Sequence, residues 1–502
     1  MAKSIIIVGG GIAGLAAGCY GQMNGYQTKI FELHDIPGGL CTSWERSDYI
    51  IDGCIHYLYG SAPGQPFYTL WEELGAIQGR RMINQKEFMH IVDPDGRTFT
   101  LYCDPDRLEA HLMELSPSDA KLIKMLADGV RTFASFDMSA LQATPRSMMG
   151  LLGWMRLGLD MLPFLLPLIK WGPVSAEDFA SRFQDPFLRR AIPLMFAWKD
   201  IPMMAGLTQV AYMYQGNGAF PEGGSLAFAQ AIEKRYLELG GEILYKSQVE
   251  KILVENDCAS GVRLYNDEEY RADIIISAAD ARSTIFEMLG GVYTNRKLRA
   301  YFDGRLPTLS LLQVSLGVAR DLSKEPHWVT HLLEQPAVIA GEERHDIWVK
   351  NYCFDPSLAP AGKSVIEVLV KTNYGYWQHI YGRKLYDTEQ DQVADQVIDL
   401  LERYHPGLRH DIEVVDVATP LSYERYTGNW MGSTCGWLLT KRTMPLNILG
   451  INKTLPGLKN FYLIGQWVEP GGSLPLAASS GKNAIRMICH ADRIQFQTSL
   501  PG

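Results

Sequence analysis

The sequence lacks paired cysteine motifs. Its eight cysteines are scattered along the chain, and no two of them form a C-x-x-C pair. Disulfide frameworks and zinc sites need closely spaced thiols, so we predict reduced cysteines and no metal site. The apolar run of residues 5–8 is also too short for a signal peptide. Together these absences predict a cytoplasmic protein.

A basic cluster is missing as well. The chain of 502 residues carries 47 Lys and Arg against 56 Asp and Glu, a formal net charge of −9. Nucleic-acid surfaces concentrate positive charge, so we expect no nucleic-acid partner. The length exceeds what one simple core can organise, and two or three domains are expected. The composition does not fix an oligomeric state.

Long uncharged apolar runs are scarce. The strongest candidate, LLGWMRLGLDMLPFLLPLI at 151–169, contains Arg156, Asp160, Pro163 and Pro167. These residues are costly or disruptive in a lone membrane span, so we do not expect one. Two interpretations stay open for this stretch: a buried helix or helical pair, and an amphipathic segment that rests in the lipid headgroup region.

A glycine-rich turn near the beginning of the chain carries the first chemical signal. In residues 4–32 an apolar strand leads into Gly9-x-Gly11-x-x-Gly14, a helical segment follows, and a second strand ends in Glu32. The glycines allow a tight turn, close approach of a pyrophosphate, and close helix–strand packing. A carboxylate at the end of the second strand can bind a ribose. This spacing predicts a dinucleotide-binding unit, for NAD and FAD alike.

Two later glycine pairs narrow the choice of cofactor. Gly38-Gly39 follows Glu32 closely and would let a loop backbone approach a longer cofactor with a ribityl chain. The closing segment FYLIGQWVEPGGSLPLAASSGKNAI, residues 461–485, shows the pattern strand, glycine turn, helix. Backbone N–H groups at such a helix start bind polar oxygens. We expect this segment to return to the first domain and complete an FAD site.

The middle of the chain changes character twice. Residues 66–205 have a helical pattern rich in Met, Leu, Phe and Trp. Residues 219–280 contain an amphipathic helix near 226–239, then short alternating strands that lead to a buried Ile-rich strand. Residues 295–450 are rich in aromatic strands. We therefore predict an α/β protein in which a Rossmann-like domain is assembled from three separated segments.

The predicted domains follow from these changes. The segments 1–65, 217–292 and 455–502 would form the FAD-binding domain. The segments 66–216 and 293–454 would form a mixed α+β substrate-binding domain, in which the apolar helical stretch 148–170 is a candidate portal and membrane-docking part.

Together these residues resemble the phytoene desaturase and retinol saturase branch of FAD-dependent oxidoreductases, relatives of the amine oxidases. The resemblance covers nearly the whole chain and is strongest at VGGGIAGLAAG (8–18), FPEGGS (220–225), ADIIISAAD (272–280), ATPLSYERYTG (418–428) and the closing segment. It implies non-covalent FAD and desaturation, saturation or isomerisation of a long hydrophobic polyene by hydride transfer at flavin N5. It also implies peripheral contact with the inner face of a membrane.

The resemblance assigns the cofactor site residue by residue. The expected cofactor-binding residues are Gly9, Gly11, Ile12, Ala13, Gly14, Glu32, Leu33, Gly38, Gly39, Leu40, Val249, Ala278, Ala279, Asp280, Gly465, Gln466, Gly472, Ser473 and Leu474. The chain departs from the family pattern at three positions. Gln466 stands where an acidic residue is frequent, Leu40 where Arg is frequent, and Glu469 where His often precedes Pro-Gly.

Few protein groups need be catalytic, because the flavin performs the hydride chemistry. Glu469 is the leading acid–base candidate, since it lies in the turn expected at the flavin ring. His56 and Tyr57 are the second candidates. A flat polyene also needs an apolar tunnel, and the candidates for its wall are Tyr376, Trp377, Trp430, Trp437 and Trp467.

Three other functions stay open at this point. A flavin amine oxidase would need an aromatic cage around its amine. A flavin-dependent fatty-acid isomerase or hydratase would need a carboxylate anchor, which Arg425 or Arg146 could supply. A cofactor-stabilised binding protein for hydrophobic molecules would show no flavin reduction with any of these ligands.

Overall fold

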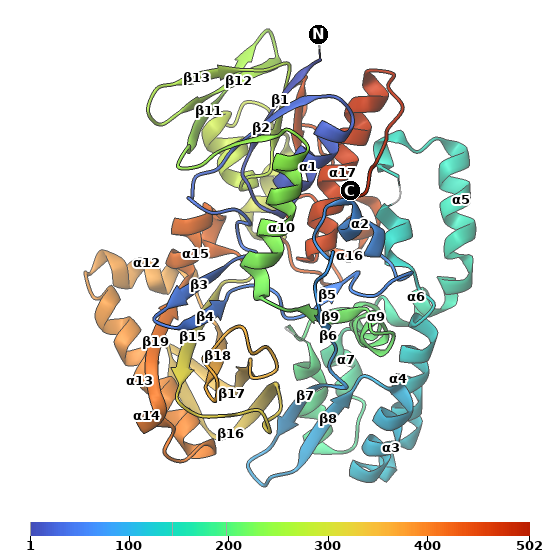
Figure 1. Cartoon of the computed structure of the whole chain (residues 1–502). Coiled ribbons are helices and arrows are strands. Elements are labelled where there is room, and N and C mark those ends of the chain that lie inside the picture. Colours follow the sequence, from blue (N-terminus) through green and yellow to red (C-terminus); the bar gives the residue numbers. More distant parts are fainter. Residues whose placement is uncertain (1, 143, 197, 502) are drawn as a thin grey trace.

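A five-stranded parallel sheet contains the glycine-rich motif in the computed structural model, which describes residues 2–142, 144–196 and 198–501 (Figure 1). The strand order is β10 (Glu242–Leu244), β2 (Gln27–Phe31), β1 (Ser4–Val8), β14 (Ile274–Ser277) and β20 (Phe461–Leu463). Every neighbouring pair is parallel. The carboxyl ends of strands far apart in sequence therefore meet at one edge of the sheet.

The central strand β1 is apolar on both faces because both faces are covered. Ile5 and Ile7 pack in the cluster that includes α1 (Ile12–Met23), α10 (Gly224–Glu238) and α17 (Leu474–Ala491). Ile6 and Val8 point to the opposite side and pack with a three-stranded antiparallel sheet. That sheet consists of β11 (Val249–Glu255), β12 (Cys258–Leu264) and β13 (Glu269–Arg271). Side chains alternate between the two faces of a strand, and both faces of β1 are buried, so every residue of this run is apolar.

Helices α1 and α17 lie against each other in Figure 1, although they come from opposite ends of the chain. A Cβ at Gly481 would lie 2.5 Å from the carbonyl oxygen of Ala13, so only glycine permits this approach. This contact fixes the closing segment beside the glycine-rich turn.

A seven-stranded mixed sheet forms the other large layer. Its order is β19 (Ile412–Ala418), β15 (Leu311–Val318), β18 (Ser364–Lys371), β17 (Glu342–Asn351), β16 (Trp328–Ile339), β7 (Glu87–Val92) and β8 (Thr98–Tyr102). All neighbours are antiparallel except β16 and β7. The helices beside this sheet are α12 (Tyr374–Gly382), α13 (Tyr386–Tyr404), α14 (Leu408–Asp411) and α15 (Pro420–Thr427), and α13 packs against one of its faces.

The helical prediction for residues 66–205 was wrong at 82–102. The chain forms β6 (Met82–Ile83), β7 and β8 there, and β7 with β8 completes the large sheet. The turn between β7 and β8 contains Asp93 and Gly96, whose φ is +83°. The alternation of FMHIV and TFTLY around a Pro-Asp-Gly turn was the missed hairpin signal. The helix predicted at 226–239 is present as α10, slightly shifted.

Shorter strands and helices connect these layers. Two small sheets contain β3 (Ser43–Arg46) with β4 (Tyr49–Asp52), and β5 (Leu58–Tyr59) and β6 on either side of β9 (Gly218–Pro221). The remaining α-helices are α2 (Tyr68–Glu73), α3 (Pro105–Leu115), α4 (Ala120–Phe133), α5 (Leu151–Met161), α6 (Leu165–Trp171), α7 (Ala176–Ala180), α8 (Pro186–Ala191), α9 (Met203–Tyr214), α11 (Arg296–Ala300) and α16 (Met444–Leu449). Residues 1 and 502, the ends of the predicted first and last segments, lie outside the described residues, as do 143 and 197.

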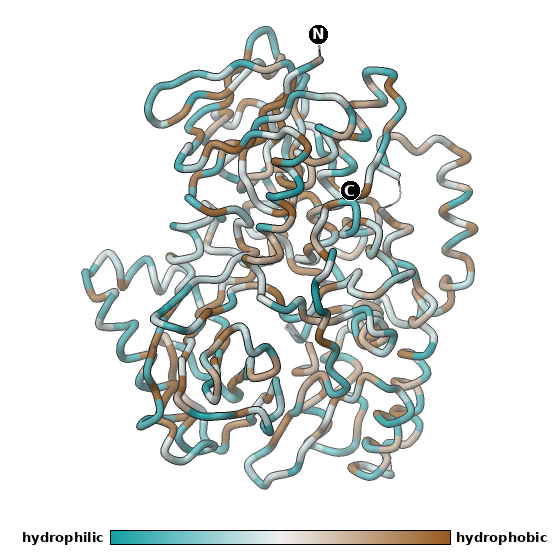
Figure 2. Tube along the Cα trace, viewed as in Figure 1, coloured by the Kyte–Doolittle hydropathy of each residue, from teal (hydrophilic) through white to brown (hydrophobic). Residues whose placement is uncertain are grey.

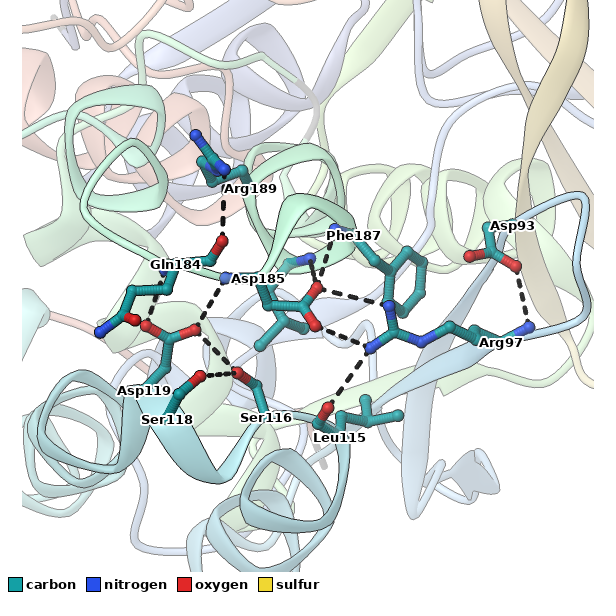
Figure 3. A network of polar contacts seen from close by, with 11 residues as sticks. Asp93, Arg97, Leu115, Ser116, Ser118, Asp119, Gln184, Asp185, Phe187 and Arg189 are labelled. Atoms are coloured by element: carbon teal, nitrogen blue, oxygen red, sulfur yellow. Dashed lines mark hydrogen bonds and ion pairs between the residues drawn. The ribbon is translucent and has the colours of Figure 1, made fainter.

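A polar network fastens the helical region to the large sheet (Figure 3). The buried carboxylate of Asp119 accepts the backbone N–H groups of Gln184 and Asp185 at 2.8 and 3.1 Å, and the hydroxyl of Ser116 at 2.8 Å. Asp185 in turn caps α8 and pairs with Arg97 at 2.9 Å. Burial opposes ionisation, but these hydrogen bonds hold the pKa values of both carboxyl groups below their ordinary value.

The apolar stretch predicted at 148–170 is helical and exposed. Residues Leu151–Trp171 form α5, a 3-10 turn and α6, and α5 runs along the edge of the molecule in Figure 1. Among the described residues this is the one helix that is long and apolar enough to cross a membrane, by length and composition only. Large apolar side chains, including Leu152 (80% exposed) and Leu166 (77%), face solvent. Figure 2 shows the hydrophobic residues interspersed along it.

Candidate functional site

The turn between β1 and α1 is shaped by its glycines. Gly9 has φ +100°, which favours glycine. A Cβ at Gly11 would point into the narrow space before the carbonyl oxygen of Gly38, 3.7 Å away. A Cβ at Gly14 would lie 2.0 Å from the carbonyl oxygen of Gly9. Gly11 is the N-cap of α1 and no side chain caps that helix, so its first backbone N–H groups are available to an anionic ligand.

Glu32 lies at the carboxyl end of β2 and is buried. One carboxylate oxygen accepts the N–H of Gly10 at 2.6 Å, and the other accepts the N–H of His34 at 2.8 Å. Burial raises the pKa of Glu32, and the two backbone N–H groups oppose that rise. The carboxylate is thus fixed beside the glycine-rich turn, within 3.1 Å of a Cβ built on Gly10.

The second glycine pair contacts the first. The N–H of Gly38 donates to the carbonyl oxygen of Gly10 at 3.0 Å, and Gly38 and Gly39 both have positive φ. At Gly38 a Cβ would lie 2.2 Å from the carbonyl oxygen of Cys41, so a side chain cannot be accommodated. Two loops distant from each other in sequence therefore form one glycine-lined wall.

The ends of β14 and β20 complete this edge. The N–H of Ala278 donates to the carbonyl oxygen of Val8, and a Cβ at Gly465 would lie 3.6 Å from the Cβ of Ala13. Asp280 accepts the N–H groups of Ser283 and Trp430, and burial raises its pKa to about 6. The structure brings the following predicted cofactor residues to this sheet edge or the turns beside it: Gly9, Gly11, Ile12, Ala13, Gly14, Glu32, Leu33, Gly38, Gly39, Ala278, Ala279, Asp280 and Gly465. Val249 begins β11 and is buried.

A mostly apolar cavity begins where this edge ends. Its volume is about 260 Å³. The turn and helix start at residues 471–477 form one of its walls, and Leu40 and Gln466 lie beside that wall. Five predicted cofactor residues line it: Leu40, Gln466, Gly472, Ser473 and Leu474. No side chain caps the N-terminus of α17. We call this space the main cavity.

The opposite walls of the main cavity are aromatic and aliphatic. Its aromatic lining residues are Tyr57, Tyr59, Phe88, Phe196, Trp198, Trp328 and Trp348. They come from β5, β7, β16, β17 and the loops around them, so the cavity lies between the parallel sheet and the seven-stranded sheet. The indole N–H of Trp198 donates to the carbonyl oxygen of Leu439 at 2.8 Å, which fixes one of these rings.

The five aromatic residues predicted as tunnel candidates lie elsewhere. Trp430, Trp437 and Trp467 pack against one another, with ring centroids of Trp437 and Trp467 4.8 Å apart. Tyr376 bonds Glu389 and Trp377 is fully buried beside α13. None of the five lines the main cavity. Their spacing in the sequence carried no information on which face of each element meets the cavity, and we do not propose them as tunnel residues.

His56 and Tyr57 both line the main cavity. Burial, and then the charge of Lys350, holds the pKa of His56 well below its ordinary value. The ammonium of Lys350 lies 2.6 Å from Nδ1 of His56. Burial raises the pKa of Tyr57 to about 12, and a hydrogen bond from Tyr59 opposes that rise. Lys350 was missed by the sequence reading; its signal was a lysine inside the buried strand segment IWVKN.

Glu469 is buried but does not line the main cavity. Its carboxylate pairs with Lys453 at 2.5 Å, and both side chains border a separate small cavity of about 60 Å³ that also contains Arg146. The backbone turn is where the sequence places it, but the side chain points to the other side. Its catalytic role stays a prediction that this geometry does not favour.

Comparison with known proteins agrees with this arrangement. The family described as flavin containing amine oxidoreductase matches residues 12–488 of the chain. The chain belongs to this flavin amine oxidoreductase family. A phytoene desaturase (lycopene-forming) of Pseudescherichia vulneris is 26% identical over 96% of this chain and 98% of its own length. A chloroplastic prolycopene isomerase of an Oncidium hybrid cultivar is 24% identical over 95% of this chain and 82% of its own length.

Solved structures share the fold. A cofactor-site variant of putrescine oxidase superposes with a TM-score of 0.64 at 12% identity, covering 98% of this chain and 99% of that one. An oxidoreductase from Methanosarcina mazei gives a TM-score of 0.60 at 16% identity, covering 96% and 100%. Both likenesses concern the amine-oxidase-like fold, with its α/β part and mixed sheets.

As a member of the flavin amine oxidoreductase family, the chain is an FAD-dependent oxidoreductase. The residues present fit this cofactor. The space before Gly11 is one that a Cβ would fill, the starts of α1 and α17 carry no side-chain cap, and a buried carboxylate stands at the end of β2. Among the described residues, no group of three or more His, Cys, Asp or Glu side chains is arranged to hold a metal ion.

Proposed function

We propose that this chain acts on C–C bonds of a long hydrophobic polyene, such as a carotenoid, retinoid or other isoprenoid, by desaturation, saturation or isomerisation. The observation that carries the proposal is the main cavity, in which the glycine turn at 471–472 faces a wall of aromatic side chains. A flat apolar chain can stack in such a space and exclude water. The relatives named phytoene desaturase and prolycopene isomerase act, by their names, on carotenoids.

FAD would lie along the sheet edge with its flavin at the main cavity. Gly9, Gly11 and Gly14 would hold the pyrophosphate, Glu32 the adenosine ribose, and Val249 the adenine through its backbone. The second group of residues, toward the flavin end, is Gly38, Gly39, Leu40, Gly465, Gln466, Gly472, Ser473 and Leu474. Bound FAD supplies hydride transfer at N5.

The side chains of this protein would orient the substrate and handle a proton. Trp328, Trp348 and Phe88 offer flat apolar faces, which favour a planar conjugated chain. His56 faces the same space and is the polar group that we assign to proton transfer, with Tyr57 beside it.

The substrate would reach the main cavity through the apolar helical region. Met161 and Phe164, at the end of α5 and in the turn after it, pack with the cluster that also contains Met195 and Phe196, which line the cavity. We propose that the exposed apolar face of residues 148–170 rests on the inner face of a membrane, so that the protein is cytoplasmic and peripheral. The domain division into 1–65, 217–292 and 455–502 against 66–216 and 293–454 belongs to this proposal.

The test is an anaerobic reaction of the FAD-loaded protein with three ligand classes. Phytoene in phosphatidylcholine vesicles should bleach the flavin band near ~450 nm, whereas putrescine and oleic acid should not. Prolycopene offered to the chemically reduced protein gives a separate readout of isomerisation from the product spectrum.

The other outcomes identify the competing functions. Bleaching by putrescine alone would identify an amine oxidase, and conversion of oleic acid alone a fatty-acid enzyme. No reaction with any ligand, in a protein that binds FAD, would leave the binding-protein function.

A further inference from the structure

A buried chain of polar groups stands behind His56. Nζ of Lys350 lies 2.6 Å from Nδ1 of His56, within hydrogen-bond distance, and donates to the hydroxyl oxygen of Tyr352 at 2.8 Å. The hydroxyl of Tyr352 donates to Glu367 at 3.0 Å. Lys350, Tyr352 and Glu367 are each 2% exposed. Such a costly arrangement in a protein interior needs a reason.

The strand register of the large sheet explains how these groups meet. Lys350 on β17 is paired with Glu367 on β18 and with Trp328 on β16. Side chains of directly paired residues share one face of a sheet. This face is the one beneath the main cavity, because Trp328 lines the cavity and its ring lies 5.4 Å from that of His56.

The charge of Lys350 determines the tautomer of His56. While Lys350 is protonated, its ammonium has only donors, so Nδ1 of His56 accepts and the ring proton is on Nε2. His56 is the member of this chain of groups that lines the main cavity. When Lys350 is neutral, the ring proton can lie on Nδ1 and be donated to Nζ of Lys350, and Nε2 is then free to accept a proton.

We propose that His56 and Lys350 form a proton-transfer pair at the wall of the main cavity, and that Glu367, reached through Tyr352, sets the charge of Lys350. The inference rests on the proposed function, because it needs a substrate in that cavity. Removal of one hydrogen from each carbon of a C–C single bond would release a hydride, for which bound FAD would be the oxidant, and a proton. That proton passes to Nε2 of His56 while the Nδ1 proton passes to neutral Lys350, and the electron pair of the second C–H bond becomes the new double bond.

The charged groups around Lys350 and His56 determine whether the desaturation rate rises or falls with pH. Burial lowers the pKa of Lys350, while the charges of Glu367, Asp52 and Cys54 raise it. His327 lines a small neighbouring cavity together with His56 and Lys350, and Tyr57 is adjacent to His56 in the wall of the main cavity. Desaturation needs neutral Lys350, so its rate should rise with pH. Loss of the Glu367 charge should lower the pKa of Lys350 and move the rise to lower pH.

The experiment follows flavin bleaching by phytoene in phosphatidylcholine vesicles from about pH 6 to about pH 10 in FAD-loaded protein, in rapid anaerobic mixing. Lys350→Met should slow bleaching by about 100-fold and flatten the pH profile, because a positioned acid–base group contributes about that factor. Glu367→Gln and Tyr352→Phe should shift the inflection to lower pH. Tyr236→Phe is the matched control, since that buried tyrosine donates to the carbonyl oxygen of Thr28 at 2.9 Å, apart from this chain of groups; its profile should match the wild type.

A second readout does not depend on turnover. In ¹⁵N-histidine NMR, with the signal assigned by its loss in His56→Asn, His56 should show the Nε2–H tautomer at neutral pH. That tautomer should change when Lys350 loses its proton, and Lys350→Met should abolish the titration.

The outcomes separate the inference from the proposed function. A Lys350→Met protein with the wild-type pH profile, or a His56 tautomer that is insensitive to Lys350, would overturn the proton-transfer pair. If phytoene fails to bleach the wild-type flavin and prolycopene is not isomerised by the reduced protein, the proposed function fails, and the tautomer titration alone decides the pair.

Discussion

Gly14 faces the carbonyl oxygen of Gly9 so closely that a Cβ on Gly14 would lie 2.0 Å from that oxygen. The start of α1 is thereby pressed onto the end of β1. The same contact holds the uncapped helix N-terminus at the sheet edge where FAD is proposed to bind. Because Gly14 has no Cβ, helix α1 can pack against the end of β1 and hold its N-terminus at the proposed cofactor site.

Gly14→Ala should therefore destabilise the protein by about 2–3 kcal/mol, because the backbone must move to relieve the overlap. Thermal unfolding and the ratio of bound flavin to protein measure both consequences. Gly153→Ala is the matched control, since the nearest atom to its Cβ would be 3.5 Å away. That helical substitution should be neutral or stabilise by about 0.5–1 kcal/mol. Equal stability of the two variants would contradict the steric argument.

Glu32→Gln should weaken FAD binding about 10- to 100-fold. The substitution keeps the shape of the side chain but removes the charged acceptor at the end of β2, and hydrogen bonds to charged groups contribute about 1.5–3 kcal/mol. Calorimetric titration of the apoprotein with FAD gives the affinity. Glu242→Gln, at the start of the neighbouring strand β10, alters an exposed pair with Lys29 and should leave the affinity unchanged. Equal losses in both variants would refute a specific role for Glu32.

Glu469→Gln should reduce stability without slowing the flavin reaction. The variant leaves the partly buried ammonium of Lys453 without its charge partner, which should cost about 2–3 kcal/mol, below the cost of breaking a fully buried pair. Bleaching by phytoene should stay within about threefold of wild type, because Glu469 does not line the main cavity. A double variant with Lys453→Met should recover part of the stability. A fall of about 100-fold in bleaching, in a folded protein, would restore Glu469 as the acid–base group.

A double substitution of Leu152→Asp and Leu166→Asp should abolish flotation with phosphatidylcholine vesicles. Both side chains are more than three-quarters exposed, at 80% and 77%, so the melting temperature should not change. Tyr265→Asp, 65% exposed on the three-stranded sheet side, should leave flotation intact. Retained flotation of the double variant would show that residues 148–170 do not contact the membrane.

Asp119→Asn should destabilise the protein at neutral pH by about 2–4 kcal/mol. The carboxylate of Asp119 accepts two backbone N–H groups and one hydroxyl, and the substitution removes its negative charge. The lowered pKa of Asp119 means that its contribution is present above its unfolded pKa and is lost as pH falls through the folded value. Urea unfolding between about pH 7 and pH 3 should therefore show a smaller loss of stability with acid in the variant than in wild type. Parallel curves for the two proteins would contradict this assignment.

The glycine-rich turn and the closing segment could be predicted from the sequence because each depends on residues that are close together in the chain. The order strand, glycine turn and helix within residues 4–32 specifies the backbone conformation of the turn in any fold. The closing segment has the same order of elements. The hairpin β7–β8 had an equally local signal in its alternation and its turn, and was missed because the surrounding residues are helical. The side-chain orientation of Glu469 had no such signal, because the turn that contains it has two sides.

By itself, the sequence determined the dinucleotide-binding turn and its glycine positions, since those depend on backbone geometry within a few residues. Its resemblance to a known family, over nearly the whole chain, determined the family and the cofactor. The tertiary structure alone decided which aromatic rings face the main cavity, that Glu469 pairs with Lys453, and that Lys350 lies against His56. Those relationships join residues separated by long stretches of chain. Strand register and helix packing set them, and neither is written in any single segment.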